Sequence, residues 1–270
     1  HMAAQPLVRE SYNNPLETYS INVMGTANIL EACRNIKSVR AIVNVTTDKC
    51  YENKEWEWPY RENEPMGGHD PYSSSKGCSE LLSNSYARSF FNEKDIFLAT
   101  ARAGNVIGGG DWSKDRLVPD ALKAFQNKQQ AIIRNPQATR PWQHVLEPIA
   151  GYLSLAEKLY TYGNDYTGAW NFGPSESGVA TVSDVLEKLS KKWGEDASWS
   201  LEKGSQPHEA KNLMLDISKA RTRLGWEPLW NLDKAIEEIV IWHKTWLNNP
   251  NQIKDLCIQQ IDSYENLMQR

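Results

Sequence analysis

The sequence has no apolar stretch of membrane-spanning length and no run of basic residues. A membrane helix needs about 20 mostly apolar residues, whereas charged residues make up 24% of this chain and interrupt its apolar segments. A net charge of −4 without a basic cluster argues against a general nucleic-acid binder. We therefore expect neither a membrane nor a nucleic acid among the partners.

Cysteine and histidine are scarce. The four Cys and five His are dispersed, with no CxxC or HxxxH pair. Metal and redox sites usually need such close spacing, so the sequence predicts no metal site. Widely separated thiols are typical of proteins kept reduced, and we expect a cytoplasmic location.

Two phosphate-binding glycine motifs are also missing. The glycine cluster between Gly104 and Asp111 is not followed by Gly-Lys-Ser/Thr, so it is not a Walker loop, and it does not fit GxGxxG. It predicts a mobile or tightly turned ligand loop instead.

What the chain does contain is an alternation of apolar strands with amphipathic helices. The runs 39–45 and 96–102 have the length and composition of buried parallel strands. Shorter strands are expected at 130–134, 169–172 and 213–216. Helices are expected at 15–34, 72–92, 117–128, 147–162, 181–193, 218–224, 232–248 and from 253 onward. This alternation predicts an α/β protein with a parallel sheet.

One predicted helix carries a pair of residues suited to proton transfer. Asp70 and Pro71 predict its start, with Asp70 as the N-cap. Tyr72 and Lys76 are four residues apart and therefore lie on one helix face. An ammonium beside a phenol lowers the tyrosine pKa from about 10, so that the phenolate can take a proton from a sugar hydroxyl. The alternative is a solvated helix face without a catalytic role.

Polar residues also follow the first predicted strand, at Thr46-Thr47-Asp48-Lys49. Open α/β sheets bind ligands at the carboxyl ends of their strands. Asp48 is either a functional carboxyl group or a turn former. Further along, Arg140 precedes Trp142 by two residues, an arrangement that can hold phosphate and stack a base, or that forms a surface salt bridge.

Taken in order, these motifs resemble the extended branch of the short-chain dehydrogenase/reductase superfamily, which acts on nucleotide sugars. Tyr72 and Lys76 match its YxxxK motif. The HxAA, NV and HV segments of that branch are matched at residues 1–4, 105–106 and 144–145. Within the branch, the segments 47–51, 104–112, 140–148 and 207–210 are most similar to the dehydratases that act on CDP-glucose. The related dTDP-glucose enzymes have Asp-Glu where this chain has Asp48-Lys49.

The resemblance implies two domains, and the sequence departs from the family pattern in one respect. Residues 1–108 and 141–173 would form a Rossmann-like doubly wound parallel sheet that binds NAD. Residues 109–140 and 174–270 would form a smaller, mostly helical domain that binds the sugar nucleotide. The glycine-rich turn that holds the NAD pyrophosphate is absent, so the sheet is expected to be N-terminally incomplete, by roughly 75 to 80 residues of the family pattern. A homodimer through the helices 15–34 and 72–92 is also implied.

The resemblance further assigns residue roles. The reaction would convert CDP-D-glucose to CDP-4-keto-6-deoxy-D-glucose, for deoxysugar and O-antigen biosynthesis. The alternatives are a 4-epimerase on the same scaffold or a non-catalytic binding protein. The catalytic residues would be Thr47, Asp48, Lys49, Tyr72 and Lys76. The NAD-binding residues would be Ala3, Ala4, Gln5, Asn22, Thr46, Tyr72, Lys76 and Ala103. The substrate-binding residues would be Asn105, Arg116, Leu117, Arg140, His144 and His208.

Overall fold

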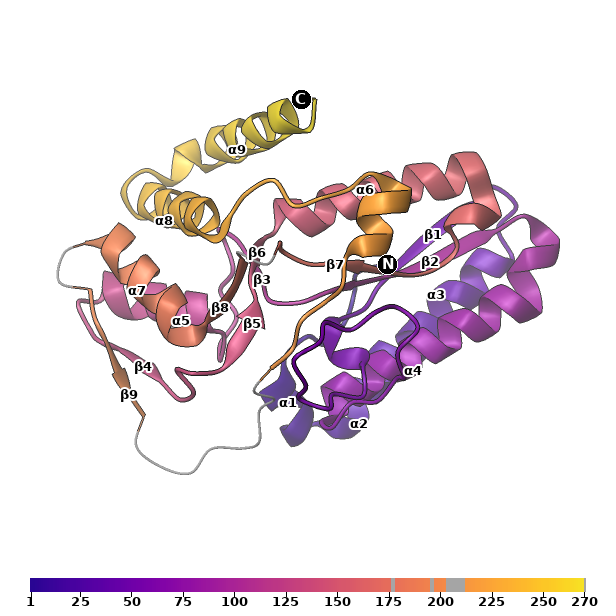
Figure 1. Ribbon diagram of the computed structural model, residues 1–270, viewed down its shortest axis with the longest axis horizontal. Helices are drawn as coiled ribbons and strands as arrows, with labels where there is room; N and C mark the ends of the chain where they lie inside the picture. Colours follow the sequence, from indigo (N-terminus) through magenta and orange to yellow (C-terminus); the bar gives the residue numbers. More distant parts are fainter. Residues whose placement is uncertain (176–177, 195–196, 203–211, 270) are drawn as a thin grey trace. The chain divides into compact units, whose positions relative to one another are not determined.

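The computed structural model describes residues 1–175, 178–194, 197–202 and 212–269. The chain forms two compact units (Figure 1). The first contains residues 1–104, 149–173 and 213–227, and the second contains 105–148, 174–212 and 228–270. Within the described part of the chain, no helix is both long and apolar enough to cross a membrane.

These units differ from the expected division at 105–108, 141–148 and 213–227. The strands β3 (Val106–Ile107) and β6 (Gln143–His144) pair with each other, which keeps the first two segments together in the second unit. Leu213 and Leu215 are buried against Tyr51 and Tyr60, which places the third segment in the first unit. The binding of NAD to one unit and of the sugar nucleotide to the other stays a prediction.

The first unit is built on a parallel sheet of three strands in the order β1-β2-β7. These are β1 (Ala41–Val45), β2 (Phe97–Ala103) and β7 (Gly168–Phe172). The register pairs Asn44 with Thr100 and Arg102 with Asn171. The parallel sheet expected from the apolar runs is thereby confirmed, as is the Rossmann-like fold that the resemblance implies.

Helices cover both faces of this sheet (Figure 1). On one face, α6 (Leu146–Tyr162) packs Leu155 and Leu159 against Trp170 and Phe172. On the other face, α3 (Gly25–Arg34) and α4 (Pro71–Tyr86) enclose a core that includes Leu30 and Leu98. The sheet is therefore buried on both sides, as its nearly continuous apolar strands require.

The helices expected at 15–34 and 72–92 both contain a π-helical turn. The first consists of α2 (Pro15–Tyr19), a π turn at Ser20–Met24 and α3, and it is preceded by the unexpected helix α1 (Val8–Asn13). The second consists of α4, a π turn at Ala87–Phe91 and a 3-10 turn at Asn92–Lys94. Such turns insert one residue into a helix and often occur at functional sites. Asn22 lies within the first of them.

One expected strand, 213–216, is wrong. Only Leu215 pairs, in a single bridge with Tyr60. The alternating leucines are buried because they join the core around Tyr51 and Tyr60, not because the segment enters a sheet. The following segment forms a π turn at Ala220–Leu224 that ends at Gly225, whose φ of 70° suits glycine.

In its described residues, the second unit combines four long helices with short strand pairs. Its helices are α5 (Leu117–Gln126), α7 (Val182–Trp193), α8 (Leu232–Asn248) and α9 (Ile253–Met268). Besides β3 and β6, β4 (Ala131–Ile133) pairs with β9 (Trp199–Leu201) and β5 (Thr139–Pro141) pairs with β8 (Val179–Thr181). Short 3-10 turns also form at Asp48–Cys50 and Gly163–Tyr166 of the first unit and at Pro250–Gln252 of the second.

The glycine cluster of the second unit has a packing role. A Cβ atom on Gly109 would lie 2.2 Å from Cγ of Trp242, and Gly110 has a φ of +77°. Glycine is required here because the backbone approaches the indole ring closely and then turns. A ligand-binding role for this loop stays a prediction.

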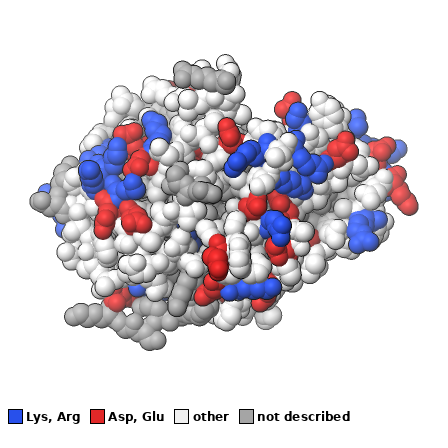
Figure 2. Space-filling model, viewed as in Figure 1, with Lys and Arg blue, Asp and Glu red and all other residues white. Residues whose placement is uncertain are grey.

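Charges of both signs are interspersed on the face drawn in Figure 2. Lys and Arg number 30 and Asp and Glu number 34 in the whole chain.

Candidate active site

The carboxyl end of β1 leads directly into a buried polar turn. Thr46, Thr47 and Asp48 are 7%, 5% and 2% exposed, and the 3-10 turn Asp48–Cys50 packs against α4. The Thr47 hydroxyl donates to Asp48 Oδ1 at 3.1 Å and accepts from the Lys49 N–H at 3.4 Å. The backbone and one side chain thus hold Asp48 and half-buried Lys49 in a defined turn.

Helix α4 begins as its sequence predicts. Asp70 is its N-cap and accepts from the Ser73 N–H at 2.9 Å and from the Ser73 hydroxyl at 2.6 Å. Pro71 occupies the first turn, where it leaves no hydrogen bond unmade. This cap fixes the turn that carries Tyr72, which is 8% exposed.

Lys76 connects this helix to the end of the strand. Its ammonium donates to the Val45 carbonyl at 3.1 Å. Burial lowers the pKa of Lys76 to about 8, against the opposing effects of the Glu80 carboxylate and the Cys50 thiol. Because only one of three N–H donors is used in this bond, the ammonium retains donors for a ligand. Tyr72, Lys76 and the Asp48 turn therefore belong to one unit and one strand end.

Asn22 lies in the π turn and connects the first residues of the chain to α4. Its Oδ1 accepts from the Gln5 N–H at 2.8 Å, and its Nδ2 donates to Ser75 Oγ at 2.9 Å and to the Gln5 carbonyl at 3.0 Å. Asn22 is thereby bonded to Ser75, the residue that directly precedes Lys76 in α4. Ala3 is exposed, whereas Ala4 and Ala103 are half-buried. Their contact with NAD, and that of Thr46, stays a prediction.

Tyr152 of α6 was not among the expected site residues. Burial raises the pKa of the Tyr152 phenol, and Tyr72 and Asp48 raise it further. Its ring packs edge-on against Phe172 at 5.3 Å. The only signal in the sequence is a tyrosine on a predicted amphipathic helix, which does not distinguish it from a core residue.

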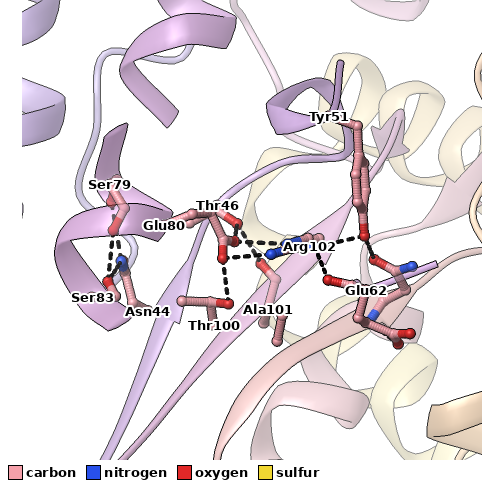
Figure 3. Close-up of polar contacts among 12 residues, drawn as sticks. Asn44, Thr46, Tyr51, Glu62, Ser79, Glu80, Ser83, Thr100, Ala101 and Arg102 are labelled. Carbon is pink, nitrogen blue, oxygen red and sulfur yellow. Dashed lines mark hydrogen bonds and ion pairs between the residues drawn. The ribbon is translucent and has the colours of Figure 1, made fainter. Parts of the chain in front are cut away.

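A buried ion pair beneath the strand ends was also missed (Figure 3). Glu80 and Arg102 are each about 5% exposed and lie 2.8 Å apart. Two signals were available in the sequence. Glu80 follows Lys76 by one helical turn, and Arg102 is a charged residue in an otherwise apolar strand, where charges are rarely buried without a partner.

The expected substrate-binding residues belong mostly to the second unit. Arg140 is buried in β5 and donates to the Thr139 carbonyl at 2.9 Å. Arg116 lies 3.4 Å from Asp111, and half-buried Leu117 begins α5. Asn105 aligns β3 with β6, because its carbonyl accepts from the Gln143 N–H at 3.3 Å. His208 lies outside the described residues. Their substrate contacts stay predictions.

His144 has a structural role in this unit. It is 2% exposed, and its Nδ1 accepts from the Leu146 N–H at 3.3 Å, at the start of α6. Its ring lies 4.8 Å from that of Trp230. Burial lowers the pKa of His144 to about 4, so the imidazole is neutral at pH 7. A substrate contact by this ring stays a prediction.

The parallel sheet, the strand-end turn and the helix with Tyr72 and Lys76 define an extended short-chain dehydrogenase/reductase. The model of the family described as GDP-mannose 4,6 dehydratase matches residues 1–239. The chain belongs to this family.

Known proteins similar to the chain include enzymes that modify nucleotide sugars. The chain is 54% identical over 258 residues to CDP-glucose 4,6-dehydratase of Salmonella typhimurium, covering 94% of this chain and 72% of that protein. A UDP-glucuronic acid 4-epimerase from Bacillus cereus, in complex with UDP-glucuronic acid and NAD, is 26% identical with a TM-score of 0.79, covering 90% of this chain and 74% of that one. The dTDP-glucose 4,6-dehydratase from Streptomyces venezuelae, with NAD bound, has a TM-score of 0.78 at 21% identity, covering 94% and 74%.

Proposed function

We propose that this protein converts CDP-D-glucose to CDP-4-keto-6-deoxy-D-glucose by a NAD-dependent elimination of water. The observation that carries the proposal is the packing of the Thr47-Asp48-Lys49 turn against the helix that holds Tyr72 and Lys76. The 54% identity to a CDP-glucose 4,6-dehydratase supports the same substrate. A proton-transfer pair and an adjacent acid suit a reaction that combines oxidation with elimination.

The residues of the first unit fit the nicotinamide end of NAD. Lys76 retains ammonium donors for ribose hydroxyls, and the small side chains of Ala3, Ala4 and Ala103 allow a flat ring to approach the backbone. The glycine-rich turn for the pyrophosphate is not part of the sequence. When bound, NAD would supply the hydride chemistry, as an acceptor for the oxidation and as a donor for the reduction that follows the elimination.

Tyr72, Lys76 and Thr47 would carry out the oxidation at carbon 4. The Tyr72 phenolate takes the proton of the carbon 4 hydroxyl, and the Lys76 ammonium favours that phenolate electrostatically. The Thr47 hydroxyl lies at the strand end and hydrogen-bonds the carbon 4 oxygen as it becomes a carbonyl. The resulting ketone acidifies the neighbouring proton on carbon 5.

Asp48 and Lys49 would then carry out the elimination. Lys49 would take the proton from carbon 5, and the Asp48 carboxyl group would donate a proton to the departing carbon 6 hydroxyl. Lys49 would then return its proton to carbon 5 when hydride reaches carbon 6. Both groups are set in one turn. Their opposite roles require a base and an acid within a few ångströms, which adjacent residues of a 3-10 turn can supply.

Product analysis tests the proposal. The full-length protein is incubated with CDP-glucose and NAD, and the product is treated with strong alkali, in which a 4-keto-6-deoxy sugar absorbs and a 4-epimer does not. We expect the absorbing product. For Asp48→Asn, we expect oxidation of carbon 4 without dehydration. An epimer as product, or unchanged dehydration by Asp48→Asn, would contradict the proposal.

We propose further that the protein is cytoplasmic and forms a homodimer through α2, α3 and α4. These helices pack beside one another in the first unit. Their large exposed apolar side chains support the proposal, because such patches commonly mark interfaces. Among them are Leu16, Ile29 and Leu81, which are 84%, 42% and 60% exposed.

A further inference from the structure

The buried ion pair between Glu80 and Arg102 lies at the centre of a continuous polar network (Figure 3). Arg102 donates from Nε to Glu80 Oε1 at 2.9 Å and from Nη2 to Glu80 Oε2 at 2.8 Å. This bidentate geometry fixes both the orientation of the two side chains and the distance between them. It connects α4 to β2.

Two strand residues complete the hydrogen bonding of the carboxylate. The Thr46 hydroxyl donates to Glu80 Oε1, and the Thr100 hydroxyl donates to Oε2 at 2.7 Å. Glu80 thereby accepts four hydrogen bonds in a buried site. Thr46 is the residue that directly precedes Thr47.

The Arg102 guanidinium group forms hydrogen bonds on the other side of the turn Asp48–Cys50, which holds the predicted catalytic residues Asp48 and Lys49 and is called the catalytic turn below. Its Nη1 donates to the Tyr51 hydroxyl at 2.7 Å and to the Glu62 carbonyl at 3.0 Å. The Tyr51 hydroxyl in turn donates to Asn171 Oδ1 on β7 at 2.7 Å. Tyr51 directly follows the turn Asp48–Cys50, so the one ion pair is bonded to the residues on both sides of the catalytic turn.

The same pair is also tied to the helix that carries the proton-transfer residues. Glu80 follows Lys76 by one turn of α4, and its carboxylate acts electrostatically on Lys76. Glu80 therefore interacts with Thr46 and Lys76, and Arg102 interacts with Tyr51. Neither Glu80 nor Arg102 is among the predicted catalytic residues. Stability alone does not account for such a pair, because well-packed apolar residues often replace buried ion pairs without loss of stability.

We propose that Glu80 and Arg102 are positioning residues that clamp both ends of segment 46–51 to α4, so that Asp48 and Lys49 are aligned with Tyr72 and Lys76. The inference rests on the proposed dehydratase function. The clamp acts through Thr46 at one end of the segment and through Tyr51 at the other. A displacement of about 1 Å at reacting groups can lower a rate by about 100-fold, so a clamp of this kind affects turnover more than it affects stability.

The test compares two disruptions with one matched control in the full-length protein. Tyr51→Phe removes a single hydroxyl from the clamp. The double variant Glu80→Leu/Arg102→Met replaces both charges together and leaves no unpaired charge buried. Ser83→Ala is the control, because Ser83 is buried on the same helix and bonds to Asn44 of β1, which lies outside segment 46–51. Turnover of CDP-glucose, thermal midpoint and hydrogen exchange of amides 46–51 are measured for each.

We expect Tyr51→Phe and the double variant to lower kcat by about 10- to 100-fold with little change in KM. Reduced nicotinamide should accumulate, because misplacing Asp48 and Lys49 slows elimination more than oxidation. Amides 46–51 should exchange faster in both variants than in Ser83→Ala. The double variant should keep a thermal midpoint near that of the wild type.

The inference is overturned if Tyr51→Phe has the same kcat as Ser83→Ala and the same hydrogen exchange of amides 46–51. This comparison is sufficient even if the double variant does not fold. It is also overturned if the folded double variant has wild-type kcat. Hydrogen exchange separates this inference from the proposed function. Faster exchange of amides 46–51 in Tyr51→Phe, in a protein whose wild type does not turn over CDP-glucose, supports the clamp and contradicts the dehydratase proposal.

Discussion

At the scale of single residues, Lys76 combines a structural bond with a charge that the proposed chemistry needs. Its bond to the Val45 carbonyl holds α4 against the end of β1, and its ammonium faces the same strand end as the Asp48 turn. Burial makes that charge costly, which the lowered pKa of about 8 reflects. The cost of burying the Lys76 charge should be measurable as a dependence of stability on pH.

Replacing Tyr72 tests the proposed proton acceptor. Tyr72→Phe keeps the buried ring and removes only the hydroxyl, so the fold should be retained. General-base catalysis contributes about 100- to 10,000-fold, and we expect a loss of that size in CDP-glucose turnover by the full-length protein. A loss of less than about tenfold would contradict this role for Tyr72.

Lys76 should make stability depend on pH in alkali. The pKa of Lys76 is about 8 in the folded protein, against an ordinary 10.5. Between these values the unfolded chain binds more protons, so the free energy of unfolding should rise with pH, by up to about 3 kcal/mol. Lys76→Met should lack this rise, as measured by denaturant unfolding at pH 8 and pH 10.5. Equal pH dependence in both proteins would show that Lys76 is not buried as described.

The residues of the site differ in how far the sequence alone can identify them. Tyr72 and Lys76 are recognisable because one helical turn separates them, and Asp48 because it directly follows a buried strand. Glu80 and Arg102 are 22 residues apart on different elements. Their pairing depends on how β2 packs against α4, which no local spacing specifies. The position of Tyr152 likewise depends on the packing of α6 on the sheet.

At the scale of the element, the start of α4 links local stability to the site. Asp70 caps the helix through Ser73, one residue after Tyr72. Asn231 caps α8 in the same manner, accepting from the Lys234 N–H at 2.9 Å, and belongs to the other unit. The two caps are comparable in chemistry and differ in their relation to the proposed site.

Removing each cap should separate stability from activity. Asp70→Ala and Asn231→Ala should each lower the free energy of unfolding by about 1 kcal/mol. Only Asp70→Ala should also lower kcat, because it frees the turn that positions Tyr72. Denaturant unfolding and turnover of the two variants provide the comparison. Equal kcat values would show that the cap of α4 does not position Tyr72.

The start of α6 should be sensitive to acid through His144. The pKa of His144 is about 4 when folded, against an ordinary 6.5. The unfolded chain binds more protons between these values, so stability should fall by up to about 3 kcal/mol as the pH falls from 6.5 to 4. His144→Asn keeps an acceptor near the Leu146 N–H but does not titrate. A smaller acid-induced loss in this variant is the expected result of denaturant unfolding, and an equal loss would assign the effect to other groups.

The same elements show what a sequence pattern can and cannot specify. Leu232–Asn248 forms as a single helix because a cap, an apolar stripe and a following proline all agree. The alternating leucines at 213–215 carry the pattern of a strand, yet their alternation reflects burial against Tyr60. The π turn at Ser20–Met24 has no signal in spacing, because it depends on contacts between Asn22, Gln5 and Ser75.

At the scale of the whole molecule, the chain provides two units with separate cores. The first holds the predicted catalytic residues, and the second holds most of the predicted substrate-binding residues. Such a division suits a reaction in which one domain supplies oxidation chemistry and another selects the nucleotide. It also leaves one apolar surface of the first unit, on α2, α3 and α4, without a role in either function.

That surface should be the homodimer interface. Leu81 of α4 is 60% exposed, and Leu153 of α6, on the opposite face of the sheet, is 67% exposed and serves as the matched control. In a two-fold dimer, Leu81→Glu places a like charge on both copies at an interface that excludes water, and such charges repel strongly. We expect Leu81→Glu to sediment as a monomer and Leu153→Glu to sediment as a dimer. Monomeric wild-type protein, or dimeric Leu81→Glu, would contradict this interface, whereas loss of the dimer in Leu153→Glu alone would move it to the α6 face.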